Sequence, residues 1–142
     1  MNDLSGAGAK TFGGRWNHRG TALISTSETR SLAMLEFLVR VSWMQAPGDM
    51  GLATLEIADQ IQSESLSPAD LPGDWRHYPA PPGLADLGTG WVRSKGSLLL
   101  RVPSAVVEQE YNILINPEHS DLVRVTVLEV KDFEFDRRLL KK

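Results

Sequence analysis

The chain has 142 residues, of which 42% are hydrophobic and 23% charged, with a formal net charge of −3 and no cysteine. This length and composition predict one globular domain over residues 1–142 and exclude intrinsic disorder, disulfides and thiolate metal sites. The acidic balance argues against nucleic acid as a direct partner, and no apolar run approaches the roughly 20 residues of a membrane span. No apolar signal-peptide region follows Met1, so we expect a cytoplasmic protein.

The elements expected along the chain alternate early between strand and helix and end in a series of strands. Hydrophobic periodicity, capping residues and glycine or proline punctuation set their approximate bounds. In order, they are an irregular glycine-rich start at 1–20, a short buried strand at 21–26, a helix within 25–41, a turn at 44–49, a strand at 51–59, a surface loop at 62–83, a short helix at 84–94, strands at 97–102, 111–116 and 122–133, and a terminal turn or helix at 136–142.

The helix expected within residues 25–41 has recognisable start signals. Ser27 is a favourable N-cap, and Glu28 would lie in the first turn, where the helix dipole favours a negative charge. Leu32, Leu35 and Val39 share one face at helical spacing. Further apolar neighbours widen that face, so we expect the helix to be buried on most sides.

This order of elements favours an α+β fold: a compact single domain with a mostly antiparallel, split sheet and few helices. The predicted helices are too few and the strands too crowded toward the end for a doubly wound parallel sheet. The loop at 62–83 is rich in proline and longer than a connection requires. Loops of this length usually have a function of their own, such as a lid over a site.

Several motifs that bind nucleotides or metals fail on inspection. "GAGAKT" lacks the glycine that a phosphate-binding loop needs immediately before Lys10, and the dinucleotide glycine pattern starting at Gly6 has Thr11 in its third glycine position. The three histidines are far apart in the sequence and form no zinc motif, so no metal site is expected. No GxSxG element is present to anchor a hydrolase triad.

Glu36 is the only charged residue in the apolar stretch from Ser31 to Val39. A carboxylate in such a stretch costs several kcal/mol unless it has a partner. One interpretation pairs it with Arg40, four residues later on the same helix. The other has it facing a cleft, where it would bind hydroxyls or stabilise a positive charge.

Arg15 stands directly behind Gly13 and Gly14. Such glycines let a backbone and a ligand approach closely, and the planar guanidinium suits a phosphate group. Trp16 would either stack on a ring or fill the core, and Asn17 can donate and accept hydrogen bonds at once. The alternative for Arg15 is an ordinary surface residue of a loop.

Polar residues also punctuate the later strands. Ser104 follows the strand at 97–102 and a proline, and Asn112 stands within the strand at 111–116. Taken singly, a serine in this position is more often a cap or turn residue, and asparagines are commonly turn formers. Their position alone assigns them no chemistry.

Several blocks, in a fixed order, carry a resemblance to a known family. They are "GGRWN" at 13–17, "TSE" at 26–28, "A.LE.LV" at 33–39, "S.LLRVPSAVV" at 97–107, "LINP" at 114–117 and "F.FD.RLL" at 133–140, where a dot marks any residue. Together they resemble the RES-domain toxins of Xre–RES toxin–antitoxin pairs, named for an Arg, a Glu and a Ser. The resemblance runs from Ser5 to Leu140, so it covers nearly the whole chain.

The resemblance implies a fold similar to that of ADP-ribosyltransferases, with NAD+ as substrate and no cofactor. NAD+ would be cleaved at its nicotinamide–ribose bond by hydrolysis or phosphorolysis. The family Arg falls on Arg15, the Glu on Glu36 and the Ser on Ser104, with Ser97 as a second candidate. Glu36 would stabilise the oxocarbenium character of the ribose, Arg15 would bind the pyrophosphate or the ribose, and Ser104 would orient the nicotinamide.

The remaining residues expected to bind the substrate are Trp16, Asn17, Ser25, Ser97 and Asn112. Family members usually carry a Tyr just before "TSE", where this chain has Ser25. One expected aromatic is therefore missing, and Trp16 is the residue that would replace it. This departure keeps open a catalytically weakened binding relative, beside a second alternative, an ADP-ribosyltransferase that modifies a host protein.

The resemblance also implies partners. We expect a cognate Xre-type antitoxin whose C-terminal segment fills the cleft, and homodimer formation within that complex.

Overall fold

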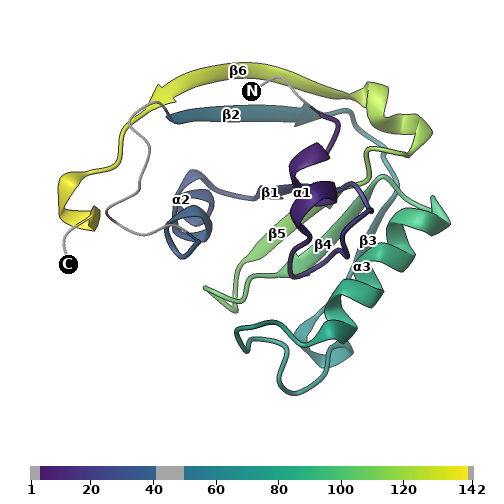
Figure 1. Ribbon diagram of the computed structural model, residues 1–142. Helices are drawn as coiled ribbons and strands as arrows, with labels where there is room; N and C mark the ends of the chain where they lie inside the picture. Colours follow the sequence, from purple (N-terminus) through teal and green to yellow (C-terminus); the bar gives the residue numbers. More distant parts are fainter. Residues whose placement is uncertain (1–3, 41–49, 141–142) are drawn as a thin grey trace.

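The computed structural model describes residues 4–40 and 50–140, and its helices and strands are labelled in Figure 1. In chain order they are α1 (Ala7–Phe12), β1 (Ile24–Ser27), α2 (Arg30–Leu38), β2 (Met50–Ile57), β3 (Ser63–Ser65), α3 (Pro82–Ser94), β4 (Leu99–Pro103), β5 (Tyr111–Ile115) and β6 (Val125–Phe133). Short 3₁₀ turns lie at Pro68–Asp70, Ser120–Arg124 and Arg137–Leu140. The strands pair mostly antiparallel, which confirms the predicted α+β fold.

Four of these strands form one sheet in the order β1-β5-β4-β3. β5 is antiparallel to both of its neighbours, and only the edge strand β3 runs parallel, beside β4. Directly paired residues such as Val102 and Asn112 project from the same face of a sheet. Leu100 and Leu114 are also paired and share that face, which we call the core face.

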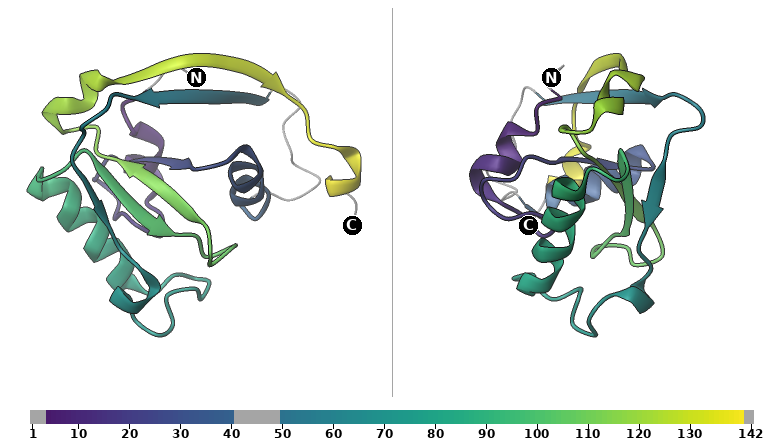
Figure 2. Two further views of the ribbon diagram at one scale, coloured as in Figure 1. Left: turned by 180° about the vertical axis from the view of Figure 1, so that it is seen from behind. Right: turned by 90° about the vertical axis from the view of Figure 1, so that its right-hand side faces the viewer.

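The core face is covered by α1, α3 and the turn between α1 and β1 (Figures 1 and 2). Three tryptophans and aliphatic side chains of α3 and the sheet form the main cluster there: Trp16, Leu23, Trp75, Leu84, Trp91, Val92, Leu100, Val102 and Leu114. Each large aromatic side chain removes about 150–250 Å² from water, so this cluster supplies much of the driving force for folding. It also fixes the backbone that surrounds the candidate site.

β2 and β6 form a separate two-stranded antiparallel ribbon, which arches over one end of the four-stranded sheet (Figure 1). An isolated two-stranded ribbon is only marginally stable in water. This one is held at its base by a second apolar cluster around Leu98, Ile115 and Val125, all of them buried. Near its far end Phe135 stacks on Phe37 of α2, with ring centroids 5.6 Å apart.

The start of the chain departs from the sequence prediction, because residues expected to be irregular form α1. Its flanking glycines explain the helix: Gly6 and Gly13 both have positive φ angles, near 70°, which other residues rarely adopt. A Cβ atom on Gly6 would lie 2.6 Å from the backbone nitrogen of Leu23. Gly6 therefore permits a close approach between the start of α1 and the segment that leads into β1.

The beginning of α2 also differs from the prediction. The N-cap is Thr29, whose hydroxyl accepts a hydrogen bond from the Leu32 amide at 3.1 Å, and Ser27 is instead the last residue of β1. The helix is less buried than expected: only Leu32 is fully buried, and Val39 is 64% exposed. α2 therefore lies against the sheet along one narrow face.

The predicted loop at 62–83 contains regular structure. Its first residues form β3, and its last two begin α3. The run Ser63–Ser65 is wholly polar and exposed, so no hydrophobic pattern marks it as a strand. The strands predicted at 51–59, 97–102, 111–116 and 122–133 and the helix at 84–94 are confirmed within a few residues, whereas the turn predicted at 44–49 lies outside the described residues.

Candidate active site

Arg15 lies in a tight turn that crosses the middle of α3 (Pro82–Ser94), beside Gly88. The amide of Gly14 donates to the carbonyl of Asn17 at 3.0 Å, so Arg15 and Trp16 occupy the two central positions of the turn. Consecutive central residues of such a turn send their side chains in different directions. Here Trp16 enters the core and Arg15 remains half-buried at the surface.

Trp16 fills the core rather than a ligand site. It is 7% exposed and packs in the main cluster with Trp75 and Trp91. The turn fits there because position 88 of α3 is glycine: a Cβ atom on Gly88 would lie 1.7 Å from the carbonyl oxygen of Trp16. The prediction that Trp16 binds the substrate by stacking is therefore wrong, since its ring is covered on the folded chain.

Asn17 is also structural. Its side chain is 3% exposed, and its amide nitrogen donates to the carbonyl oxygens of Ala9 at 2.8 Å and Thr21 at 3.0 Å. These bonds tie α1 and the approach to β1 to the turn of Arg15. The prediction that Asn17 contacts the substrate is corrected accordingly: it fixes the backbone that carries Arg15.

The guanidinium of Arg15 binds two backbone carbonyls of the proline-rich segment. Nη1 donates to the carbonyl of Trp75 at 2.6 Å, and Nη2 donates to that of His77 at 3.2 Å. Partial burial lowers the pKa of Arg15, and the negative charge of Glu36 opposes that shift. The two charges predicted to share a site therefore interact electrostatically.

Glu36 points from α2 toward the ends of β4 and β5, not along its own helix. Its Oε2 atom accepts a hydrogen bond from the Ser104 hydroxyl at 2.9 Å and another from the side-chain amide of Asn112. Arg40 makes no ion pair with Glu36 in the described part of the chain. Between the two interpretations of Glu36, the contacts favour the carboxylate that faces other elements of the fold.

Ser104 is completely buried, and every hydrogen-bonding position of its hydroxyl is used. The hydroxyl accepts from the amides of Val106 and Val107, each at 3.1 Å, and its proton is directed to Glu36. A serine hydroxyl has one proton and two lone pairs. Ser104 thus fixes the Glu36 carboxylate, with its own orientation set by the backbone that follows β4.

Asn112 completes this arrangement from β5. Its carbonyl oxygen accepts a hydrogen bond from the Ser27 hydroxyl at 2.7 Å, so its amide group is oriented toward Glu36. We call Ser27, Glu36, Ser104 and Asn112 the carboxylate cluster. Ser27 was predicted as a helix cap, and its bond to Asn112 follows from the strand register, which places the two residues directly opposite each other.

The two other serines named from the sequence lie in different surroundings. Ser97 is buried; its hydroxyl accepts from Trp91 Nε1 at 2.9 Å and donates to Glu64 at 2.5 Å, so it links α3 to β3. Its hydrogen bonds go to Trp91, Glu64 and Leu99, so of the two serines considered for the family position it is Ser104 that bonds Glu36. Ser25 is exposed on β1, two residues before Ser27, and therefore projects from the core face as the cluster does.

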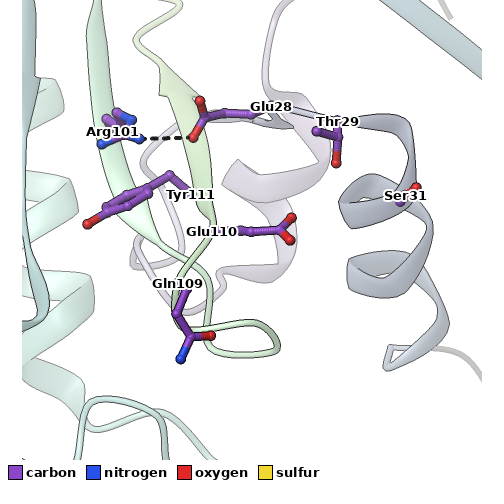
Figure 3. A pocket seen from close by; sticks show the side chains of 7 residues that line it. All are labelled: Glu28, Thr29, Ser31, Arg101, Gln109, Glu110 and Tyr111. Atoms are coloured by element: carbon purple, nitrogen blue, oxygen red, sulfur yellow. Dashed lines mark hydrogen bonds and ion pairs between the residues drawn. The ribbon is translucent and has the colours of Figure 1, made fainter.

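A larger hollow lies on the opposite face of the sheet (Figure 3). It measures about 390 Å³ and is lined by Glu28, Thr29, Ser31, Arg101, Gln109, Glu110 and Tyr111. The Arg101 guanidinium lies 3.6 Å from the centre of the Tyr111 ring and pairs with Glu28 at 3.3 Å. A second hollow, about 150 Å³, separates α2 from the β2–β6 ribbon, and neither is lined by Arg15, Glu36 or Ser104.

No group of three or more histidine, cysteine or acidic side chains that could hold a metal ion occurs among residues 4–40 and 50–140. Within the same ranges, none of the helices has the length and apolar character that crossing a bilayer requires.

Comparisons with known proteins agree with the sequence blocks. The family model of the RES domain matches residues 1–138. The protein named Prs ADP-ribosylating toxin from Sphingobium sp. (strain YBL2) is 37% identical over 143 residues, spanning 99% of this chain and 89% of that protein. Toxin Res from Yersinia enterocolitica is 42% identical over 136 residues, spanning 95% and 89%.

The fold also matches a solved structure. A chain of the M. tuberculosis MbcT–MbcA toxin–antitoxin complex superimposes with a TM-score of 0.77, covering 94% of this chain and 78% of that one at 19% identity. At that identity the match concerns the fold.

Proposed function

The chain belongs to the RES-domain family, and on this premise we propose that it is the toxin of a toxin–antitoxin pair and acts by cleaving NAD+ at the nicotinamide–ribose bond. The names of its relatives, Toxin Res and Prs ADP-ribosylating toxin, support both parts of the proposal. The observation that carries it is the Glu36 carboxylate, held by Ser104 and Asn112 and within electrostatic reach of Arg15.

The chemistry requires a fixed negative charge. As the bond between the ribose C1′ and the nicotinamide nitrogen breaks, its electron pair leaves with nicotinamide and positive charge develops on the ribose. A carboxylate that is already oriented stabilises this charge without reorganising, which is the usual source of large rate enhancements. One Glu36 oxygen is held by Ser104 and Asn112, and the carboxylate fixed in this way would stabilise the developing charge.

Arg15 would bind the anionic part of the substrate. Its guanidinium has five N–H donors, of which the bonds to Trp75 and His77 use two. The remaining donors and the positive charge suit a pyrophosphate oxygen. Ser25, exposed on the same face, is available to a hydroxyl of the substrate in place of the tyrosine that the family usually has there.

The group that accepts the ADP-ribose defines a second candidate function. Water or inorganic phosphate adding to C1′ would give free ADP-ribose or its phosphate. A nucleophilic side chain of another protein would give a modified host protein, and the name of the Sphingobium relative favours this candidate. Both candidates use the same carboxylate, so the products and not the site residues distinguish them.

An antitoxin is the expected protein partner. The matched structure is part of a toxin–antitoxin complex, which supports a cognate protein that neutralises this chain by covering the Glu36 side of the sheet. We expect an Xre-type antitoxin to fill this role and to place two copies of the toxin in one complex.

The test is to incubate purified protein with NAD+, with and without phosphate, and to follow nicotinamide release by chromatography. We expect release by the native protein and about 1,000-fold slower release by Glu36→Gln, whose side chain has nearly the same volume. The same reactions, run with a bacterial lysate and read by mass spectrometry, separate free ADP-ribose from a modified protein. Folded protein that leaves NAD+ intact in buffer and in lysate, and that does not lower NAD+ in cells, would contradict the proposal.

A further inference from the structure

Two arginines connect the proline-rich segment to the candidate site. We call residues 66–81, between β3 and α3, the proline-rich loop. Arg15 donates into this loop, to the carbonyls of Trp75 and His77. Arg76 lies between these two positions and donates out of the loop, to the turn that follows β4.

The contacts of Arg76 are with two successive peptide groups. Nε donates to the carbonyl of Ala105 at 3.0 Å, and Nη2 donates to the carbonyl of Val106 at 3.5 Å. The third nitrogen, Nη1, pairs with Glu108 at 3.4 Å in a partly exposed ion pair. Two guanidinium nitrogens thus donate to backbone carbonyls, and the third forms an ion pair with an acidic side chain.

The same two peptide groups hold Ser104 from their other side. The carbonyl of Ala105 and the amide of Val106 belong to one planar peptide unit, and the carbonyl of Val106 and the amide of Val107 belong to the next. Both of these amides donate to the Ser104 hydroxyl at 3.1 Å. In a trans peptide the C=O and N–H groups point in opposite directions, so Arg76 and Ser104 lie on opposite sides of the turn.

This geometry has two physical consequences. Fixing the carbonyls fixes the planes of the peptides and therefore the direction of the amides that orient Ser104. A cation bound at a carbonyl also polarises the peptide and strengthens its N–H as a donor. Both effects are passed on to Glu36, because the Ser104 proton is directed to its carboxylate.

We propose that Arg76 is a positioning residue for the Ser104–Glu36 pair, acting through the peptide groups of residues 105–107. It does not touch the substrate; it holds the turn that orients the carboxylate. The kinetic test of this proposal rests on the function proposed above, because it measures nicotinamide release. The structural test measures the turn directly and does not depend on that function.

Arg76→Met tests the proposal, because it keeps the apolar stem of the side chain and removes the guanidinium. We expect kcat for nicotinamide release to fall by about 10- to 100-fold, the usual effect of a small misplacement of a catalytic group, with KM changed by less than about twofold. Hydrogen exchange of the Val106 and Val107 amides should accelerate while that of core strands stays as in the native protein. Arg76→Lys, which can reach one carbonyl, should recover part of the lost kcat.

Glu108→Gln is the matched control. It removes the ion pair of Arg76 but leaves both bonds to the carbonyls, so kcat and the exchange of the two amides should stay within about twofold of native values, as expected for an exposed ion pair. Native kcat in Arg76→Met, or an equal loss in Glu108→Gln, overturns the proposal. If the native protein releases no nicotinamide, the proposed function fails instead, and unchanged amide exchange in Arg76→Met then refutes the role of Arg76 in holding the turn.

Discussion

The two faces of the four-stranded sheet each carry an arginine and a carboxylate, but in opposite settings. On the core face Glu36 is held by Ser104 and Asn112. On the other face Arg101 pairs with Glu28 beside the larger hollow, with both side chains about 40% exposed. The carboxylate with the more fixed orientation, Glu36, therefore does not line the larger hollow.

The difference between the faces is one of preorganisation. An exposed ion pair such as Arg101–Glu28 is free to exchange its partners for water, and its net contribution is small. The carboxylate cluster is oriented by backbone amides and by neighbouring strands, so its geometry persists without a ligand. We infer that orientation by the backbone, more than the volume of a hollow, marks a chemical site in this fold.

Among substitutions on the two faces, Glu36→Gln should have the largest effect on the rate of nicotinamide release. Removing the charge should lower nicotinamide release by about 1,000-fold, the upper range for losing one electrostatic contact in a transition state. Thermal unfolding should change little because the volume is conserved. Retained toxicity in cells, with NAD+ still consumed, would place the chemistry elsewhere and break the comparison.

Arg15→Lys should come next, with a loss of about 100-fold in kcat/KM. A lysine keeps the charge but cannot hold two carbonyls of the loop and a bidentate anion with one planar group. The measurement is steady-state kinetics with NAD+, compared with nicotinamide riboside, which lacks the pyrophosphate. If the lysine variant loses equally with both substrates, Arg15 acts on the loop and not on the phosphates.

Ser104→Ala should have a smaller kinetic effect, about tenfold in kcat, because Asn112 still holds Glu36. Its stability should fall by about 1–3 kcal/mol, since two partly buried amides lose their acceptor. Urea unfolding measures the second quantity. A variant with native stability would show that the amides find other partners, and the claim that Ser104 is fixed by the backbone would fail.

The smallest effect is expected on the opposite face. Arg101→Ala should leave kcat and KM within about twofold of native values and lower stability by less than about 1 kcal/mol, as for an exposed ion pair. A kinetic loss comparable to that of Ser104→Ala would mean that the larger hollow takes part in the reaction.

Much of the fold could be predicted because short apolar runs mark the strands that meet the core. Leu98 to Leu100 and Ile113 to Ile115 are such runs, and most of their side chains proved to be buried. The errors fall where no such pattern exists. β3 is polar throughout, and α1 depends on two glycines whose conformation only the folded backbone reveals.

The site residues came from short blocks and a resemblance, whereas their contacts required the fold. Glu36 is separated by 68 residues from Ser104 and by 76 from Asn112, so no local pattern announces these bonds. The sequence left open whether Trp16 stacks on a ligand or fills the core. Its place in the core depends on Gly88, a residue of α3 far along the chain, which makes room for the Trp16 backbone. The sequence predicted which residues are candidates for the site, and tertiary packing decided which side chains contact them.

The meeting of Gly88 with the Trp16 carbonyl limits how this molecule can evolve. A methyl group at position 88 would clash with the backbone carbonyl of Trp16 and not with a movable side chain. The clash could be avoided only if the turn that carries Arg15 moved away from α3. Two residues later, a Cβ on Gly90 meets nothing, and alanine there would favour the helix by roughly 1 kcal/mol. Gly88 therefore cannot be replaced without moving the turn of Arg15, whereas Gly90, two residues away on the same helix, can be replaced by alanine.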